Sequence, residues 1–313
     1  MQTVSKGVWL CIFSQSLFGI MYLFSAWMLP LNGTDVFVLR MIGSLFAILA
    51  ILLPIMGLSG LKTFIRNELG SSWKRWLTFL MGSALAGSQF WLFMWAPVNG
   101  EGVNVAVGYF LFPLVMAFGG YLWFKERLTL LQKMALFLAA LGVAHELWTT
   151  QTFSWTSLWV CLGYPPYYLS RRAMKTPALQ GLTLDIIFIS IPCFIYLAFQ
   201  PNVTDLLVSD SRYWLFVPLL GLISAVSVTA NLKSGLLLPV SLFSMMSYLE
   251  PSLLFLFAIW FLHTPVNESA YLTYFFIWSG LLLLMLNSLY HWRFSSHKTL
   301  HTKTVQSNQS SLL

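Results

Sequence analysis

The chain has 313 residues, of which 58% are hydrophobic and only 9% are charged, and its mean hydropathy is +0.75. A soluble domain carries about 25% charged residues, so this composition excludes a soluble globular protein and indicates an integral membrane protein. The net charge of +7 is spread between apolar segments rather than gathered in one basic region, which argues against a nucleic-acid partner.

Apolar segments of about 20 residues, the length that crosses a bilayer, fill almost the whole chain. The first of them is longer than the core of a signal peptide, about 7 to 15 residues, so we expect a retained anchor. We expect ten spans, at residues 7–29, 36–58, 75–96, 103–124, 130–148, 154–170, 179–199, 213–234, 240–262 and 270–291.

Most lysines and arginines lie in every second loop between these spans. With ten spans, 15 of the 17 basic residues fall on one side of the membrane, and only Arg40 and Arg212 do not. The positive-inside rule then places both termini in the cytoplasm. The segment 293–313 has too few apolar residues to pack, so we expect a disordered cytoplasmic tail.

Two stretches, residues 108–128 and 246–266, resemble each other at an offset of 138 residues and carry Pro113 and Pro251 at matched positions. This similarity divides the chain into residues 1–149 and 150–292, with five spans each. Because five is odd, the second half enters the membrane in the opposite direction. The expected fold is an all-α membrane protein of ten transmembrane helices in two inverted five-helix repeats, with substrate near the midplane.

Glu250 is the sharpest functional candidate. It lies ten residues into its span, near the bilayer centre, where an ionisable group costs about 2.5 to 3.5 kcal/mol and usually faces a cavity or a partner. It could bind a cationic group or a coupling proton. However, the polar face of its helix carries Ser244 and Tyr248. At 100° per residue, Glu250 lies about 120° around the helix from Ser244. A protonated carboxyl bonded to a neighbouring helix is therefore the alternative.

The prolines indicate breaks or gates. Pro113 and Pro251 free the backbone carbonyls of Tyr109 and Ser247, which could line a cavity or simply accompany a packing kink. Pro165-Pro166 is interpreted as a helix break and gate, or as an early helix end.

Other polar groups at membrane depth could line an amphipathic pocket. Tyr109 is expected near its centre, and tryptophans could instead belong to an interfacial belt. Arg40 could contact substrate, snorkel outward, or pair with Asp35 or Glu146. The remaining candidates are Asn104, Asn231, Trp91 and Trp95.

The three cysteines, Cys11, Cys161 and Cys193, lie in apolar segments without a metal or disulfide spacing. The zinc-protease pattern after His145, a Walker A loop and hydrolase nucleophile motifs are absent from the sequence. We therefore expect neither a metal nor a cofactor and no enzymatic activity.

Several segments resemble the RarD branch of the EamA group, in the drug/metabolite transporter superfamily. The strongest are GYFLFPLV from Gly108 and KERL from Lys125, supported by KGVWLCIFSQSLFGIMYLFSAW from Lys6 and YFFIWSGLLLLMLNSLY from Tyr274. The resemblance implies ten helices in two inverted repeats, the bacterial inner membrane, and export of small metabolites by alternating access.

By this resemblance, some positions match family motifs and others depart from them. The matches are Asp35 and Arg40 at the start of helix two, Gly108, Tyr109 and Pro113 in helix four, and Glu126 in the following turn. The departures are Glu250 before the helix-nine proline, His263-Thr264 in the second turn, and Pro165-Pro166 in helix six.

The leading hypothesis is a secondary active exporter of a small amphipathic solute, such as an amino acid or a drug. Proton coupling stays open, since uniport or exchange needs no titratable residue, and the protein could be a monomer or a homodimer. The alternatives are an intramembrane enzyme or scaffold and, within transport, a flippase for a lipid-linked substrate.

Overall fold

The structure is a computed structural model that describes residues 2–126, 128–151, 154–253, 271–273, 275–280 and 282–283. Helices account for nearly all of this part of the chain, and none of it forms a strand, which confirms the all-α class. The helices are α1 Gln2–Trp27, α2 Gly33–Phe64, α3 Trp73–Trp95, α4 Gly102–Phe124, α5 Leu130–Thr150, α6 Trp155–Ala173, α7 Ala178–Ala198, α8 Pro201–Ser209, α9 Arg212–Leu237 and α10 Val240–Met246. A π-helical turn, Ile65–Leu69, follows α2, and a 3-10 turn, Ala96–Val98, follows α3.

Local sequence sets the helix ends. The Asn32 side chain caps α2 by accepting from the backbone N–H groups of Thr34 and Asp35 at 2.9 Å. Thr129 and Gln132 form a capping box at the start of α5. Within α2, Gly57 adopts φ 64° and ψ −178°, three residues after a proline, so the helix bends there.

Seven of the described helices, α1 to α5, α7 and α9, are long and apolar enough to cross a membrane. α6 is outside this set and carries two prolines and two arginines in its 19 residues. The expected spans 240–262 and 270–291 are only partly within the described residues, at 240–253, 271–273, 275–280 and 282–283, so the count of ten and the two repeats stay predictions. The short helix α8, in the expected loop after α7, was not anticipated.

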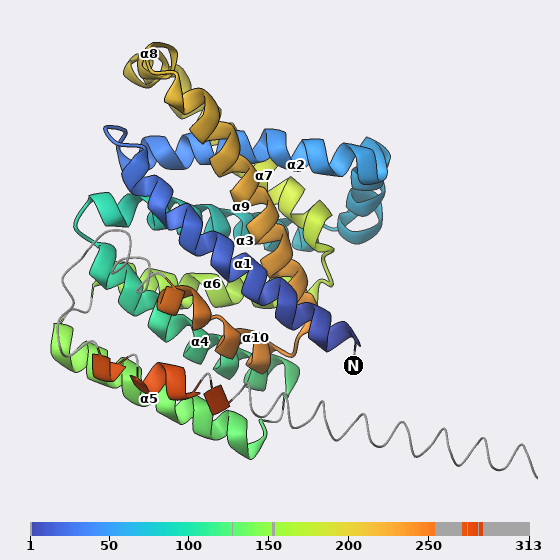
Figure 1. Cartoon of the computed structure of the whole chain (residues 1–313). Helices are drawn as coiled ribbons and strands as arrows, with labels where there is room; N and C mark the ends of the chain where they lie inside the picture. Colours follow the sequence, from blue (N-terminus) through green and yellow to red (C-terminus); the bar gives the residue numbers. More distant parts are fainter. Residues whose placement is uncertain are drawn as a thin grey trace, which may run out of the picture.

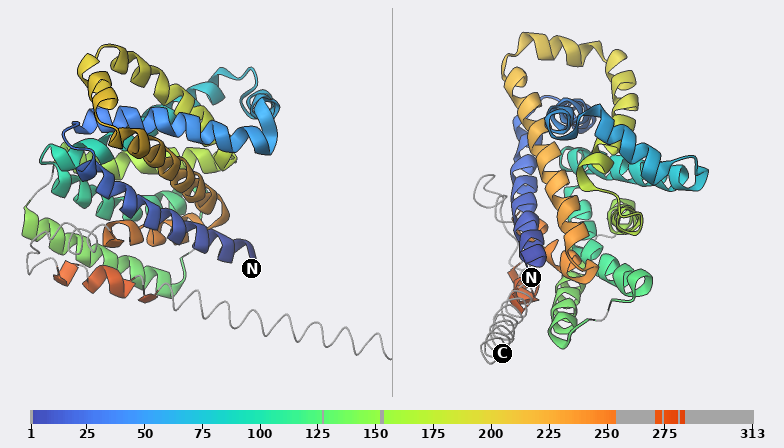
Figure 2. Two further views of the ribbon diagram at one scale, coloured as in Figure 1. Left: turned by 45° about the horizontal axis from the view of Figure 1, so that its top comes forward. Right: turned by 90° about the vertical axis from the view of Figure 1, so that its right-hand side faces the viewer.

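α9 runs antiparallel beside α1, as the ribbons show (Figures 1 and 2). Near one end Ser234 Oγ donates to the carbonyl of Gly7 at 2.8 Å, and at the other Tyr213 OH donates to the carbonyl of Met28 at 3.3 Å. α9 also crosses α2 closely, because a Cβ on Gly43 would lie 2.8 Å from the carbonyl of Val217. α9 is thus packed between two N-terminal helices.

α4 and α6 are packed parallel to each other. Ser157 Oγ of α6 donates to the carbonyl of Asn104 at 2.6 Å near one end. A Cβ on Gly119, further along α4, would lie 2.7 Å from a methyl group of Leu169. Small residues permit such close approach in membrane helices, and the approach places the aromatic side chains of α4 and α6 beside each other.

α7 packs on both α2 and α3. Tyr196 OH of α7 donates to Asp35 of α2 at 2.9 Å, and Ser190 Oγ donates to the carbonyl of Met41 at 3.4 Å. On the other side of the bundle, Thr273 Oγ1 donates to Glu146 of α5 at 2.8 Å. These contacts occupy the two carboxylates considered above as partners of Arg40.

Candidate functional site

A cavity lies in the middle of the bundle between α1, α2, α3, α4, α6 and α9 and is bordered by the segment after α10. The space that its side chains leave for a molecule the size of water is about 20 Å³. Its apolar wall consists of Phe18, Met21, Phe90, Phe93, Phe112 and Val228. Its polar groups are Gln15, Arg40, Tyr109, Tyr164, Tyr168, Asn231, Ser247 and Glu250.

Arg40 of α2 turns inward to this cavity and is only 1% exposed. Its Nε donates to Ser224 Oγ of α9 at 2.9 Å, and its guanidinium carbon lies 5.2 and 5.7 Å from the ring centroids of Phe90 and Phe93. Nη1 has no hydrogen-bond partner among the described residues. The expected outward snorkelling is therefore wrong, because α9 and the α3 rings enclose the side chain.

Glu250 borders the same cavity. It lies in a helical segment, residues 249–253, that follows a turn at Ser247 and Tyr248. Among the described residues, no hydrogen bond or ion pair engages its carboxylate. The alternative of a carboxyl bonded to a neighbouring helix is therefore not found in that part of the chain.

The turn at Ser247 and Tyr248 separates α10 from the segment that carries Glu250. Residues on both sides of this turn lie at the cavities between α4, α6 and α9. Ser247 and Glu250 line the central cavity, and the Phe243 ring packs on Tyr168 with centroids 5.3 Å apart.

The serine-rich face of this segment points elsewhere. Tyr248 packs with Phe110, Ala139 and Val143, on the side of α5. The hydroxyl of Ser244 donates to the carbonyl three residues before it at 2.8 Å, so its polarity is satisfied within its own helix. Neither Tyr248 nor Ser244 lines the central cavity, although both were candidate substrate contacts.

Three tyrosines from α4 and α6 form the aromatic side of the cavity. The hydroxyls of Tyr109 and Tyr164 lie 3.3 Å apart, and the Tyr164 and Tyr168 ring centroids are 6.1 Å apart. Tyr168 OH donates to Asn231 Oδ1 at 2.7 Å. Tyr109 and Asn231 were anticipated from the sequence, whereas the two α6 tyrosines were seen only as part of a proline motif.

Tyr168 also borders a second, small cavity of about 20 Å³, where α7 begins and α9 ends. Glu126 closes this end of the bundle, because its two carboxylate oxygens accept from the N–H groups of Val240 and Ser241 at 2.8 and 2.9 Å. Arg172 forms an ion pair with Glu126 at 3.4 Å. Tyr168 therefore separates the central cavity from a space that ends at this clasp.

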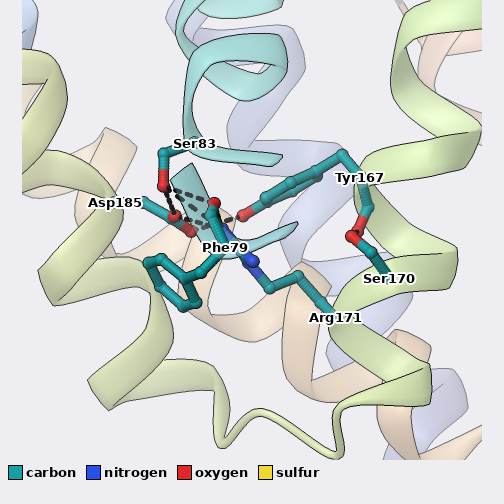
Figure 3. A network of polar contacts seen from close by, with 6 residues as sticks. All are labelled: Phe79, Ser83, Tyr167, Ser170, Arg171 and Asp185. Carbon is teal, nitrogen blue, oxygen red and sulfur yellow. Dashed lines mark hydrogen bonds and ion pairs between the residues drawn. The ribbon is translucent and has the colours of Figure 1, made fainter. Parts of the chain in front are cut away.

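A buried ion pair that the sequence analysis missed joins three helices (Figure 3). Arg171 Nη2 of α6 lies 2.6 Å from Asp185 Oδ1 of α7. Asp185 is fully buried and also accepts from Ser83 Oγ of α3 at 2.6 Å and from Tyr167 OH at 2.9 Å. The guanidinium of Arg171 lies over the Phe79 ring, 3.7 Å from its centroid. The positions of these residues in the sequence do not predict the network, because its members come together only when α3, α6 and α7 pack against each other.

Asn104, Trp91 and Trp95 lie away from the central cavity. Trp91 Nε1 donates to Thr34 Oγ1 at 3.1 Å, and its ring stacks on Trp95 with centroids 5.0 Å apart. Asn104 donates to Glu101 at 2.7 Å in the turn before α4. This bond from Asn104, with others from the hydroxyls of α6, holds the pKa of the Glu101 carboxyl below its usual value.

The prolines differ in their effect on the helices. α6 continues through Pro165 and Pro166, and α4 through Pro113, so the expected break in α6 is wrong. Close packing against neighbouring helices permits prolines in membrane helices. Near Pro251, the chain forms the turn at residues 247–248.

No group of three or more His, Cys, Asp or Glu residues that could hold a metal ion occurs among the described residues. The chemistry of the central cavity is therefore built from one guanidinium, one carboxylate, two amides and tyrosine hydroxyls within an aromatic wall. These groups suit a small solute with both polar and apolar parts, and the helices would have to move apart to admit one, because pockets for such solutes measure about 300 to 1,000 Å³.

Comparison with known proteins gives concordant matches. Residues 5–145 match the model of the EamA-like transporter family. An uncharacterized transporter of Haemophilus influenzae is 58% identical over 92% of this chain and 96% of its own length. The chloramphenicol-sensitive protein RarD of Pseudomonas aeruginosa is 40% identical over 66% of this chain and 69% of its own. A crystal structure only 15% identical shares the fold, with a TM-score of 0.63 over 90% of this chain and 97% of that one.

Proposed function

The chain belongs to the EamA-like transporter family as a RarD-like member, and we propose that it is a secondary active exporter of a small amphipathic solute that works by alternating access. The observation that carries this proposal is the central cavity, which holds buried polar groups among membrane-spanning helices. Polar groups at membrane depth are costly and usually mark a solute pathway. The proposed location is the bacterial inner membrane, with both termini in the cytoplasm, as the distribution of basic residues supports.

Equivalent helix pairings support the proposed inverted repeats. α1 packs antiparallel on α9. α6 packs antiparallel on α3, since Gln89 donates to the carbonyl of Trp159 and Arg171 donates to the carbonyl of Phe79. If residues 150–292 repeat residues 1–149, α6 corresponds to α1 and α9 to α3. The two pairings are then the same contact seen from each half.

The inner closure of the proposed exporter is the layer between the two cavities. Tyr168, held by Asn231 and packed on Phe243, forms the thin part of this layer. Glu126 on the first N–H groups of α10 forms its outer clasp. Opening toward the cytoplasm requires both contacts to separate.

Glu250 is the residue to which we assign coupling if transport is driven by protons. It is the single carboxylate among the described residues that line the central cavity, and a titratable group at membrane depth is typical of proton relays. A flux that responds to an imposed pH gradient in the wild type and not in Glu250→Gln would support this role. Equal responses in both proteins would remove it.

A second candidate function is the flipping of a lipid-linked substrate. A groove of about 600 Å³ between α2, α3 and α7 favours this function. It is lined by Thr34, Ser83, Ser88 and Trp91 among apolar side chains, and none of its described lining residues is charged. Without a charged partner for a lipid headgroup among these residues, we place flipping second.

Reconstitution into liposomes tests both functions. Vesicles are loaded with a panel of radiolabelled solutes that includes amino acids and chloramphenicol, and efflux is compared with that from empty liposomes. Export of at least one soluble solute supports the exporter. Flux of none, together with accelerated transfer of labelled lipids between leaflets, would replace it with the flippase.

A further inference from the structure

The second cavity, where α7 begins and α9 ends, combines a helix N-terminus with two arginines. Its lining includes Ala178 of α7, Arg171 and Arg172 of α6, and Gly235 of α9. Pro177 is exposed, and Arg172 and Gly235 are half-buried, so the cavity opens at this end of the bundle. On the proposed topology this end faces the cytoplasm.

The helix α7 begins without a side-chain cap. Its N-cap residue is Pro177, and the first backbone bond of the helix runs from the N–H of Gly181 to the carbonyl of Pro177 at 2.8 Å. The N–H of Ala178 has no acceptor among the described residues. Unpaired N–H groups and the helix dipole together favour an anion at such an end.

Arg171 gives independent evidence for a ligand in this cavity. Its side chain is only 4% exposed, and Nη2 is paired with Asp185 at 2.6 Å. Nη2 also donates to the carbonyl of Phe79 at 2.9 Å, which holds the guanidinium in place. Its Nε and Nη1 are buried without a hydrogen-bond partner among the described residues. Buried donors without an acceptor are rare in proteins, so these two N–H-bearing atoms indicate a bound acceptor.

The carboxylates near the cavity are already compensated. Asp185 accepts three hydrogen bonds, one of them from Arg171. Glu126 accepts from the first N–H groups of α10 and pairs with Arg172. In contrast, Lys175 is exposed in the turn before α7 and forms no ion pair among the described residues. The remaining charge at this end is positive, so the bound acceptor is expected to be an anion.

The size of the cavity and the type of donor decide the class of anion. The interior offers about 20 Å³, which is room for one water-sized group, so only one atom of the ligand enters completely. Arginine side chains and helix N-termini both bind phosphate oxygens well. A phosphate group places one oxygen inside and keeps further oxygens for Arg172 at the mouth, whereas a chloride ion has no second atom to offer.

We propose that this cavity is a phosphate-binding site, in which one phosphate oxygen accepts from the N–H of Ala178 and from the free N–H groups of Arg171, while another faces Arg172. Soluble phosphate compounds and the headgroup of an anionic phospholipid offer the same chemistry. A bound phosphate joins α6 and α7 beside the end of α9. Tyr168 separates this site from the central cavity, so the site does not depend on which solute is transported.

The melting temperature of the purified full-length protein in detergent tests binding from both sources. The soluble probes are inorganic phosphate and glycerol 3-phosphate, compared with chloride at equal ionic strength. The lipid probe is dioleoylphosphatidylglycerol, compared with dioleoylglycerol, which has the same acyl chains and no phosphate. We expect at least one phosphate probe to raise the melting temperature, and its comparison compound to need about tenfold higher concentrations or more for the same shift.

A proline at residue 178 tests the contribution of the helix N-terminus. Ala178→Pro removes one N–H, and proline is favoured at the first position of a helix. Pro177 has φ −61° and ψ 135°, a conformation that residues before proline adopt, so the variant should fold. Phosphate should bind to it about tenfold more weakly, as expected for the loss of one hydrogen bond to a charged group. Ala178→Gly keeps the N–H and is the matched control, which should bind as the wild type does.

Variants of Arg172 test the charge at the mouth. Arg172→Gln should weaken phosphate binding about tenfold, and Arg172→Lys, which retains the charge, should restore part of it. Arg66→Gln removes the same charge from the exposed turn after α2 and should bind as the wild type does. Each shift is measured against the melting temperature of the same variant without ligand, so a loss of stability is not counted as a loss of binding.

The outcomes separate the two sources and the failure of the site. Binding of the lipid alone assigns the site to a phospholipid headgroup, and binding of the soluble probes alone assigns it to free phosphate; both support the proposal. The site is refuted if no phosphate probe binds, or if chloride or dioleoylglycerol acts at the same concentrations as its phosphate counterpart. It is also refuted if Ala178→Pro and Arg172→Gln both bind phosphate as the wild type does.

Discussion

The ion pair between Arg171 and Asp185 gives a quantitative prediction about stability. Asp185 is fully buried and accepts three short hydrogen bonds, from Arg171, Ser83 and Tyr167. Asp185→Asn keeps the shape, removes the charge and leaves a buried guanidinium without a counter-ion. Removing one member of a buried pair costs about 3 to 5 kcal/mol, so we expect a loss of that size in the free energy of unfolding.

The double variant Arg171→Met/Asp185→Asn isolates the electrostatic part of this loss. Replacing both members removes the uncompensated charge, and apolar replacement of a buried pair is often close to neutral. Methionine can also keep the packing of the arginine stem on Phe79. We expect the double variant to lie within about 2 kcal/mol of the wild type, more stable than either single variant.

Unfolding with sodium dodecyl sulfate in detergent micelles, followed by tryptophan fluorescence, measures these differences. The exposed pair Arg212–Asp210 has the same 2.6 Å separation and provides the control, since Asp210→Asn should cost less than about 1 kcal/mol. The reasoning is refuted if Asp185→Asn costs no more than this control, or if the losses of the two single variants simply add in the double variant.

Three further predictions concern packing, the clasp and pH. Gly43→Val should lower the free energy of unfolding by about 1 to 3 kcal/mol, because its Cβ would lie 2.8 Å from an α9 carbonyl. The control is Gly102→Ala, whose Cβ has no atom closer than 3.6 Å and which should change the free energy of unfolding little in the same assay. Glu126→Gln removes the charge from the bonds to α10 and should speed maleimide labelling of a cysteine placed at Val240, and an unchanged rate would contradict the clasp. The pKa of Glu101 is lowered in the folded state. The stabilisation from its charge is therefore present above the unfolded pKa of about 4.3 and is lost as pH falls through the folded pKa. The melting temperatures of the wild type and Glu101→Gln should converge at low pH, and a difference that stays constant would contradict this role of Glu101.

The helices themselves were largely predictable from the sequence, because a bilayer imposes a minimum apolar length on each span. α1 to α7 and α9 contain the expected spans with ends shifted by a few residues, and α2 continues past its expected end to Phe64. Four candidate residues, Arg40, Tyr109, Asn231 and Glu250, line one cavity. The sequence could identify these polar residues, because each of them interrupts an otherwise apolar segment.

The direction in which side chains point was harder to predict than the positions of the helices. The serines of the α10 segment suggested a polar face toward the cavity, yet Ser244, Ser247 and Ser252 each donate to a carbonyl of their own helix. A hydroxyl can satisfy itself in this way and pack like a small apolar group, whereas a carboxylate cannot.

Arg171 and Asp185 show a second limit of pattern reasoning. Both lie near the ends of their spans, where charged residues usually reach water. In the structure Asp185 is fully buried and Arg171 is nearly so, because α3 supplies Ser83 and a phenylalanine ring beside them. Which helices meet is a property of tertiary packing, and a single sequence does not encode it in any local spacing.

The buried ion pair has a mechanical consequence. It fastens α6 and α7 to α3, and so joins helices from both sides of the boundary at residue 150. α9, from the C-terminal half, is fastened in the same way to α1 and α2. Contacts that hold the bundle together therefore cross the boundary near residue 150. A variant made by exchanging the sequence on one side of that boundary would break these contacts.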